Sequence, residues 1–287
     1  MISFIVSTVG ISPTFRRCLD SILRLMREGD QVIVVHQGRG FEQWSGSECS
    51  SRIQWLSISE MGLSKARNTG ARAAINDILV FVDDDMVLDE RYALNAIQHM
   101  QKGVSAVCGR ILTPDEGVPY AKTQGEYPVL IGESVFELKR CLGGNMVFSK
   151  KDFWDAGGFD EVFGAGARYG GAEDIDIVLR LLYKKLAVLY APDVIGYHPM
   201  EVRDNYEEYV DKMFRYGQGE GAVYAKHWFR YGRPWMLINY AGMLAKPLIR
   251  AVFSLFRFNP REANVYCRII AGRLKGFSEY RKSIHES

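Results

Sequence analysis

Three adjacent aspartates, Asp83, Asp84 and Asp85, directly follow the apolar run of residues 78–82. The run is rich in β-branched and aromatic residues, which predicts a buried strand that ends at the carboxylates. In an open α/β sheet, ligands bind at the carboxyl edge of the strands. Three neighbouring negative charges repel one another unless a positive group lies among them. A divalent cation holding a diphosphate would supply that charge, because Mg2+ typically uses one or two carboxylates together with phosphate oxygens. The alternative is an acidic turn with solvated side chains.

A second segment, residues 62–70, carries positive charge at the start of a predicted helix. Helical spacing puts Lys65, Asn68 and Thr69 near one face, with Arg67 beside them. A cationic helix start suits a nucleotide diphosphate through the helix dipole and the side-chain charges. The alternative is a capped surface helix with solvated Lys and Arg side chains.

Two glycine-containing segments bring further polar residues toward a ligand. Residues 170–176 place Glu173 and Asp174 at the start of a helix, where a carboxylate could act as general base. Acidic residues at a helix N-terminus are also favoured by the dipole, which is the structural alternative. Gly143 and Gly144 precede Asn145 and a predicted strand, so the backbone there approaches a ligand closely or forms a β-bulge.

The elements that must position these residues alternate between strands and helices. In the first part of the chain, strands are expected at 2–7, 31–35, 53–58 and 78–82, with helices at 13–25 and 64–75 and a loop with a short helix within 37–51. In the second part we expect a helix at 89–100, strands at 106–112, 137–142, 145–148 and 188–190, a loop at 113–133, a helical turn from Phe153 and a helix at 173–183. This order predicts an α/β fold with a parallel sheet covered by helices on both faces. From Asn205 onward the chain is expected to be helical, interrupted by residues 216–221.

Composition narrows the class of protein. A chain of 287 residues can bury a large core, and its five cysteines are odd in number and scattered, without a Cys-x-x-Cys pair. We therefore expect a reducing compartment, no disulfide framework and no zinc site. The apolar run at 2–9 lacks a basic region before it and is too short for a signal peptide. The net charge of +2 hides an asymmetry, because residues 226–287 hold twelve basic and three acidic residues. A basic tail on an acidic body indicates an anionic partner, yet no nucleic-acid-binding module is recognisable.

Five motifs in order resemble the family-2 glycosyltransferases, inverting enzymes of the GT-A fold that use nucleotide sugars. The motifs are Gly-Leu-Ser-Lys-Ala-Arg-Asn at 62–68, Phe-Val-Asp-Asp-Asp at 81–85, Gly-Gly-Asn at 143–145, Gly-Gly-Phe-Asp at 157–160 and Gly-Ala-Glu-Asp-Ile-Asp at 171–176. The resemblance covers about residues 1–200. It implies a Rossmann-like, mostly parallel sheet in a catalytic domain at 1–200, followed by a helical, basic and aromatic extension at 201–287.

The resemblance also assigns the acidic residues. Asp83 would lie near the ribose, and Asp85 would hold the Mn2+ or Mg2+ ion that bridges the diphosphate. Asp84 occupies the variable middle position and is grouped with the donor-binding residues. Asp174 matches the catalytic base, with Glu173 in a supporting or acceptor-binding role.

Other positions would contact the donor or the metal. By resemblance, the remaining donor-binding residues are Thr8, Lys65, Arg67, Asn68, Gly144 and Asn145. His198 follows the last core strand, where related enzymes can place a metal or diphosphate ligand, although a lone histidine before proline is more often structural. In the family the second strand often ends in acids that read the nucleotide, whereas here Gln37 follows His36. Its amide both donates and accepts hydrogen bonds, so UDP, dTDP and GDP all stay open.

The implied reaction is an inverting transfer from a nucleotide diphosphate sugar to a hydroxyl of a glycan or lipid-linked acceptor, as in bacterial surface polysaccharide synthesis. A nucleotidyltransferase is disfavoured, because the segment 7–13 after the first strand lacks a Gly-rich loop with Arg and Lys. The other alternative is a non-catalytic protein that keeps the fold and binds a nucleotide sugar or acts as a scaffold.

The C-terminal part points to a membrane surface. The uncharged run 235–245 is about half the ~20 apolar residues that a spanning helix needs, and Lys246 and Pro247 break it. We expect peripheral membrane contact through residues 233–260, at the inner face of the cytoplasmic membrane. The alternative is a helix that covers the catalytic core or a dimer contact, and the oligomeric state stays open.

Overall fold

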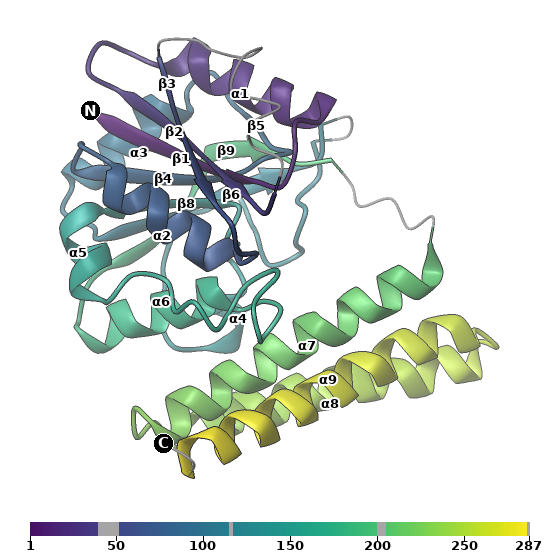
Figure 1. The fold of residues 1–287 in the computed structure, drawn as a ribbon. Helices are drawn as coiled ribbons and strands as arrows, with labels where there is room; N and C mark the ends of the chain where they lie inside the picture. Colours follow the sequence, from purple (N-terminus) through teal and green to yellow (C-terminus); the bar gives the residue numbers. More distant parts are fainter. Residues whose placement is uncertain (40–51, 115–116, 200–204, 286–287) are drawn as a thin grey trace. The chain divides into compact units, whose positions relative to one another are not determined.

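The computed structural model describes residues 1–39, 52–114, 117–199 and 205–285 (Figure 1). The chain forms two compact units. The first contains residues 1–160 and 174–200, and the second contains residues 161–173 and 201–287. The segment 161–173 thus groups with the C-terminal helices, which sequence reasoning had not considered.

A central sheet builds the first unit. Its parallel part has the order β3-β2-β1-β4 and comprises β1 (Ile2–Thr8), β2 (Gln31–Gln37), β3 (Ile53–Ile58) and β4 (Ile78–Asp83). The order continues β8-β6-β9-β5, with β5 (Val87–Leu88), β6 (Ala106–Leu112), β8 (Asn145–Ser149) and β9 (Val188–Tyr197). β8 runs antiparallel to β4 and β6, β6 is parallel to β9, and β7 (Val129–Leu130) pairs with β9.

Helices cover both faces of this sheet (Figure 1). Side chains alternate along β1, so Phe4 and Val6 face one side, where they form a core with α1 (Pro13–Leu25) and α3 (Tyr92–Gln101). The other side carries α2 (Leu63–Ala73), α5 (Lys150–Asp155) and α6 (Glu173–Tyr183). There Phe81 packs against the ring of Phe153 at a centroid distance of 5.3 Å. The expected α/β sheet with helices on both faces is confirmed.

Most predicted elements agree with the structure, and the exceptions have local causes. The predicted strand at 137–142 is wrong: Ser134 and Glu137 form a capping box that starts α4 (Val135–Leu138). The predicted loop 113–133 contains β7, and the last strand runs to Tyr197 because it pairs with both β6 and β5. The short helix expected within 37–51 falls largely on residues 40–51, which lie outside the described residues.

Three long helices dominate the second unit: α7 (Tyr206–Phe229), α8 (Met236–Phe256) and α9 (Pro260–His285). The expected interruption at 216–221 is wrong, because α7 runs through its glycines. A Cβ at Gly217 would lie 2.6 Å from Ile269 O of α9, and one at Gly221 would overlap Arg273 O. The glycines therefore let the two helix backbones approach closely, and this packing compensates for their low helix propensity.

Lys246 and Pro247 interrupt the uncharged run of the sequence but not the helix, because α8 continues through the proline. Proline has no N–H, so the carbonyl of Met243 loses its intrahelical partner. Arg273 of α9 donates a hydrogen bond to that carbonyl. Its Nε also donates to Glu220 of α7 at 2.6 Å, so one arginine side chain joins all three helices.

Within the residues that the structure describes, we find no helix with the length and apolar character needed to cross a membrane.

Candidate active site

Three of the predicted donor-binding residues end neighbouring parallel strands. Thr8 closes β1, Gln37 closes β2 and Asp83 closes β4, and the register pairs Ser7 with Asp83. Gln37 is buried, and its Oε1 accepts a hydrogen bond from Gly62 N at 2.9 Å. This bond holds the start of α2 at the same carboxyl edge, which is the edge where ligands bind in open α/β sheets.

The first two aspartates of the acidic run have different partners. Asp83 Oδ1 accepts a hydrogen bond from Arg67 Nη2 at 2.7 Å. Arg67 is buried, and its guanidinium lies over the Phe159 ring, 5.5 Å from the centroid. Asp84 Oδ2 accepts a hydrogen bond from Thr8 Oγ1 at 2.6 Å. Burial raises the pKa of Asp84 to about 6; the Thr8 hydrogen bond opposes this change, and the charges of Asp85 and Asp83 add to it.

The third aspartate meets the predicted histidine. Asp85 Oδ1 lies 3.1 Å from His198 Nε2, and His198 Nδ1 lies 2.7 Å from Pro199 O. Burial on its own would lower the pKa of His198, but the hydrogen bond and charge of Asp85 outweigh burial, so the pKa is raised. The ring of Tyr120 packs on the imidazole at 4.8 Å between centroids.

Asp85 and His198, which pair with each other here, are spaced so that both could ligate one divalent cation. Two ligands at right angles around an octahedral ion, each about 2.1 Å away, lie about 3.0 Å apart, close to the separation of Asp85 Oδ1 and His198 Nε2. No cluster of three or more His, Cys, Asp or Glu side chains suited to a metal occurs in the described part of the chain. The remaining ligands of such an ion would come from water or from a bound diphosphate.

The glycine and amide of the third motif lie directly behind the acidic run. A Cβ at Gly144 would overlap Asp83 Oδ2 and lie 3.2 Å from Met86 Sδ, so only glycine leaves room for that carboxylate. Asn145 is fully buried: its amide donates to Arg110 O and Val194 O, and its Oδ1 accepts from Tyr92. Contact between Asn145 and a donor would require one of these bonds to break.

Lys65 and Asn68, from the start of α2, also have protein partners. Lys65 forms an ion pair with the exposed Glu60. The Asn68 amide makes two hydrogen bonds with the backbone of Phe159, of 2.8 and 2.9 Å. The Lys65 side chain is 36% exposed, whereas Arg67 and Asn68 are buried, so of these three Lys65 is the one open to an anionic ligand in solution.

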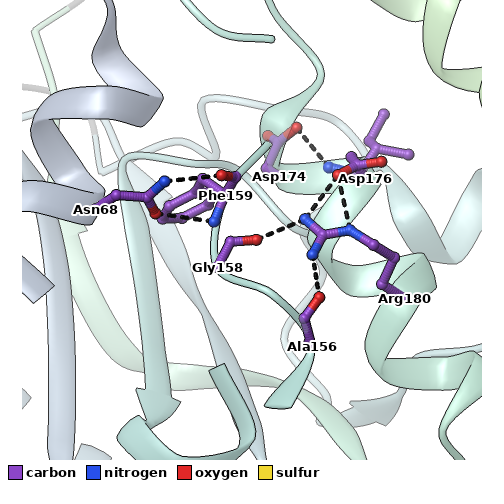
Figure 2. A network of polar contacts seen from close by, with 8 residues as sticks. Asn68, Ala156, Gly158, Phe159, Asp174, Asp176 and Arg180 are labelled. Atoms are coloured by element: carbon purple, nitrogen blue, oxygen red, sulfur yellow. Dashed lines mark hydrogen bonds and ion pairs between the residues drawn. The ribbon is translucent and has the colours of Figure 1, made fainter. Parts of the chain in front are cut away.

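Figure 2 shows how the predicted base is held. Asp174 Oδ1 accepts from Ile175 N at 2.7 Å, and Asp174 Oδ2 accepts from Gly143 N at 3.0 Å. Two residues further along α6, the buried Asp176 pairs with Arg180 at 2.7 Å. Arg180 also donates to the carbonyls of the preceding loop, at Ala156 and Gly158. Loop 156–159 is therefore fixed from α6 by Arg180 and from α2 by Asn68.

Glu173, the neighbour of the predicted base, is buried at the end of the segment that groups with the second unit. The residue before it, Ala172, has φ 69°. Non-glycine residues rarely adopt this left-handed conformation, and strained backbone of this kind clusters at functional sites.

Sequence reasoning missed four residues that support the site: Met86, Tyr92, Asp176 and Arg180. The i, i+4 spacing of Asp176 and Arg180 was a readable signal for an ion pair on α6. Met86 and Tyr92 offered no sequence signal, because they contact Gly144 and Asn145, which are more than 50 residues away in the sequence.

Comparison with known proteins identifies the family. Residues 3–157 match the model described as Glycosyl transferase family 2. The chain belongs to this family. The family consists of inverting enzymes of the GT-A fold, as the motifs predicted. Residues 133–203 also match the model described as N-terminal domain of galactosyltransferase.

Curated relatives match over parts of the chain. The uncharacterized glycosyltransferase EpsJ of Bacillus subtilis is 33% identical over 89 residues, which is 30% of this chain and 26% of EpsJ. The pre-mycofactocin glycosyltransferase of Mycobacterium tuberculosis is 26% identical over 215 residues, 69% of this chain and 43% of that protein. The chain thus spans less than half the length of these relatives.

Solved structures show the same fold. The mannosyltransferase PcManGT from Pyrobaculum calidifontis, in complex with GDP-Man and Mn2+, superposes with a TM-score of 0.65 at 18% identity, covering 97% of this chain and 87% of that one. Residues 1–349 of TarS from Staphylococcus aureus give a TM-score of 0.55 at 14% identity, covering 98% and 91%. The predicted GT-A fold is confirmed.

Proposed function

We propose that this chain transfers a sugar from a nucleoside diphosphate sugar to an acceptor hydroxyl, with inversion at the anomeric carbon. The carrying observation is that Asp174 and Asp83 flank one dipeptide: Asp174 accepts a hydrogen bond from Gly143 N, and Asp83 packs on Gly144. Consecutive Cα atoms are 3.8 Å apart. The proposed base, Asp174, and the proposed donor-binding acid, Asp83, therefore contact adjacent residues of one backbone segment. In a single displacement the base and the donor must lie at the same site.

In this mechanism Asp174 accepts the proton of the acceptor hydroxyl while that oxygen attacks the anomeric carbon. The new bond forms on the face opposite the nucleoside diphosphate, and the bond from the anomeric carbon to the diphosphate breaks with its electron pair. The hydrogen bonds from Gly143 and Ile175 orient the carboxylate that receives the proton. A placed general base typically contributes about 10²–10⁴-fold to the rate.

The leaving diphosphate needs positive charge at the strand edge. Asp85 and His198 would hold Mn2+ or Mg2+, which would stabilise the negative charge that develops on the diphosphate. Lys65 would exchange its exposed partner Glu60 for phosphate oxygens. Arg67 is buried against Asp83, so we propose that it positions this carboxylate and does not itself contact the phosphates.

The remaining residues of the site are likewise proposed either to contact the donor or to position the backbone. Thr8 and Gln37, at the ends of β1 and β2, would form the wall that meets the base of the nucleotide. Asp83 would accept from the ribose hydroxyls. Asn68 and Asn145 would act through the backbone that they hold, since their side chains are bonded to it.

The acceptor is proposed as a hydroxyl of a glycan or of a lipid-linked oligosaccharide, in synthesis of a surface polysaccharide. GDP and Mn2+ belong among the first ligands to test, since a protein of the same fold was solved with GDP-Man and Mn2+.

The experiment is a thermal-shift panel of UDP, dTDP, GDP and CMP, each with and without Mn2+. A ligand that binds only the folded state stabilises it by RT ln(1 + [L]/Kd). We expect one nucleotide diphosphate to raise Tm in a metal-dependent way and its sugar derivatives to be consumed when acceptor is added. Binding without turnover of any donor would favour the scaffold alternative, and no shift with any nucleotide would refute the proposal.

A further inference from the structure

Helix α8 has two apolar faces. One face is buried within the three-helix unit, and its members recur at intervals of three or four residues: Met236, Tyr240, Met243, Pro247, Ala251 and Ser254. The opposite face is also apolar but exposed. Its large members are Ile238, Ile249, Phe253 and Phe256, with exposed fractions of 76, 60, 65 and 80%. A helix that only covered a core would carry polar residues on this second face.

The same stretch has no negative charge. Between Glu220 and Glu262 the sequence contains neither Asp nor Glu, although it contains seven Lys and Arg residues. Three of these cations, Lys246, Arg250 and Arg257, are exposed on α8 or at its C-terminal end. The charged residues of this stretch are thus all basic, which complements an anionic surface. Glu262 of α9, the acid that ends the stretch, accepts a hydrogen bond from Ser254 on the opposite, buried face of α8 at 2.9 Å.

The turn after α8 adds a strained and fully exposed ring. Phe258 has φ 52° and an exposed fraction of 94%. This position follows the helix C-cap, where glycine is usual because a Cβ is disfavoured in the left-handed conformation. Phenylalanine there incurs backbone strain without packing inside the chain, so its ring gains nothing from the fold itself.

We propose that α8 and the following turn dock on an anionic phospholipid bilayer, with the helix lying in the plane of the interface. The rings of Phe253, Phe256 and Phe258 would enter the boundary between headgroups and acyl chains, and the cations of α8 would meet lipid phosphates. This proposal is independent of the sugar-transfer chemistry, because none of these residues belongs to the candidate active site.

The test is co-sedimentation of the full chain with phosphatidylcholine vesicles, prepared with and without phosphatidylglycerol. We expect pelleting with the anionic vesicles and its loss as salt is raised. Phe253→Asn and Phe256→Asn should each lower the partition coefficient by about 10- to 100-fold, the range expected for burying one such ring. Replacing Lys246, Arg250 and Arg257 by Gln should lower it about fivefold for each charge.

Matched substitutions in the first unit control for general loss of hydrophobicity or charge. Phe136→Asn removes a ring of 73% exposure, and Gln at Arg91, Lys102 and Lys122 removes three other exposed cations. Neither control variant should change pelleting. All the substituted side chains are exposed, so thermal unfolding and nucleotide binding without vesicles should match the wild type.

A second measurement uses Trp235, 38% exposed at the start of α8. Vesicles of brominated phosphatidylglycerol should quench the tryptophan fluorescence of the wild type, and Trp235→Phe should remove most of that quenching. Equal pelleting of the Phe253→Asn, Phe256→Asn and Phe136→Asn variants would overturn the proposal. So would a wild type that ignores every vesicle but forms a dimer disrupted by Phe256→Asn, because α8 would then meet a second copy of the chain.

Discussion

Gly144→Ala is the sharpest test of how the site is built, because it adds one methyl group beside the acidic run. The new Cβ would overlap Asp83 Oδ2, lie 3.0 Å from Asp83 Cγ and lie 3.2 Å from Met86 Sδ. Gly144 is not among the residues with positive φ, so alanine brings no backbone strain of its own. The substitution therefore acts through the space that it takes from the carboxylate.

The expected size of the effect follows from this geometry. Ordinary contacts between carbon atoms begin at about 3.5 Å, so the Asp83 carboxylate must retreat by several tenths of an ångström to about 1 Å. Arg67 Nη2 holds the other oxygen at 2.7 Å and is itself buried, which leaves the pair little room to follow. A misplacement of about 1 Å in a catalytic site can cost about 10²-fold in rate. We expect a loss of this order in kcat/KM for the donor.

The assay compares donor affinity, by titration with the nucleotide diphosphate found in the thermal-shift panel, and steady-state transfer. Gly125→Ala is the matched control, because a Cβ there meets only Arg140 Nη1, at 3.6 Å. We expect the control to behave as the wild type and Gly144→Ala to stay folded but bind poorly. Normal affinity and turnover in a folded Gly144→Ala protein would refute the inference that Asp83 must lie against this glycine to function.

Three further predictions concern single side chains. Asp85→Ala should abolish the Mn2+-dependent part of nucleotide binding in the thermal-shift assay, and an unchanged Mn2+ response would remove Asp85 from the metal site. Asp174→Asn should leave donor affinity intact and lower transfer by about 10²–10⁴-fold; near-normal turnover would shift the role of base to Glu173. Arg180→Met should destabilise the protein by about 3–5 kcal/mol in denaturant unfolding, because it removes the ion pair of the buried Asp176 and the hydrogen bonds to the carbonyls of Ala156 and Gly158. The double variant with Asp176→Leu should recover the part of that loss that comes from the ion pair, and equal instability of the single and double variants would contradict this explanation.

The sequence predicted the parallel half of the sheet well because its signals are local. The helix at 13–25 was predicted with its observed bounds, since Ser12 caps it, Pro13 opens it and its apolar residues follow the helical period. The strand at 53–58 also matches its observed limits, as does the strand at 106–112 in the other half of the sheet. In these elements the residues that begin and end the element, and its apolar periodicity, all lie within or next to the element itself.

Errors arose where partners distant in the sequence decide the structure. The glycines of α7 favour a break when read locally, yet contacts with α9 keep the helix continuous. Pro247 favours a break in the same way, yet Arg273, 26 residues later, satisfies the carbonyl that the proline leaves unpaired. Local propensity is a weak guide when tertiary packing supplies the missing interaction.

For the candidate site, the sequence predicted which residues gather but not which are bonded to the protein. Asn68, Arg67 and Asn145 were all expected to contact the donor, and all three are buried with protein partners. Residue type and motif position cannot distinguish a side chain that binds a ligand from one that holds the loop beside it. That distinction depends on burial, which the three-dimensional packing determines.

The partners of the three adjacent aspartates change the interpretation of how their mutual repulsion is offset. Read from the sequence, three adjacent carboxylates require a cation to offset their repulsion. In the structure, Arg67 neutralises Asp83, His198 pairs with Asp85, and the pKa of Asp84 is raised to about 6. Arg67 and a protonated His198 therefore offset part of the repulsion, whereas the raised pKa of Asp84 reflects its burial and the charges of its two neighbours. A cation would then be bound mainly together with the diphosphate, whose oxygens complete its coordination. For that reason, we expect Mn2+ alone to raise Tm far less than Mn2+ together with a nucleotide diphosphate.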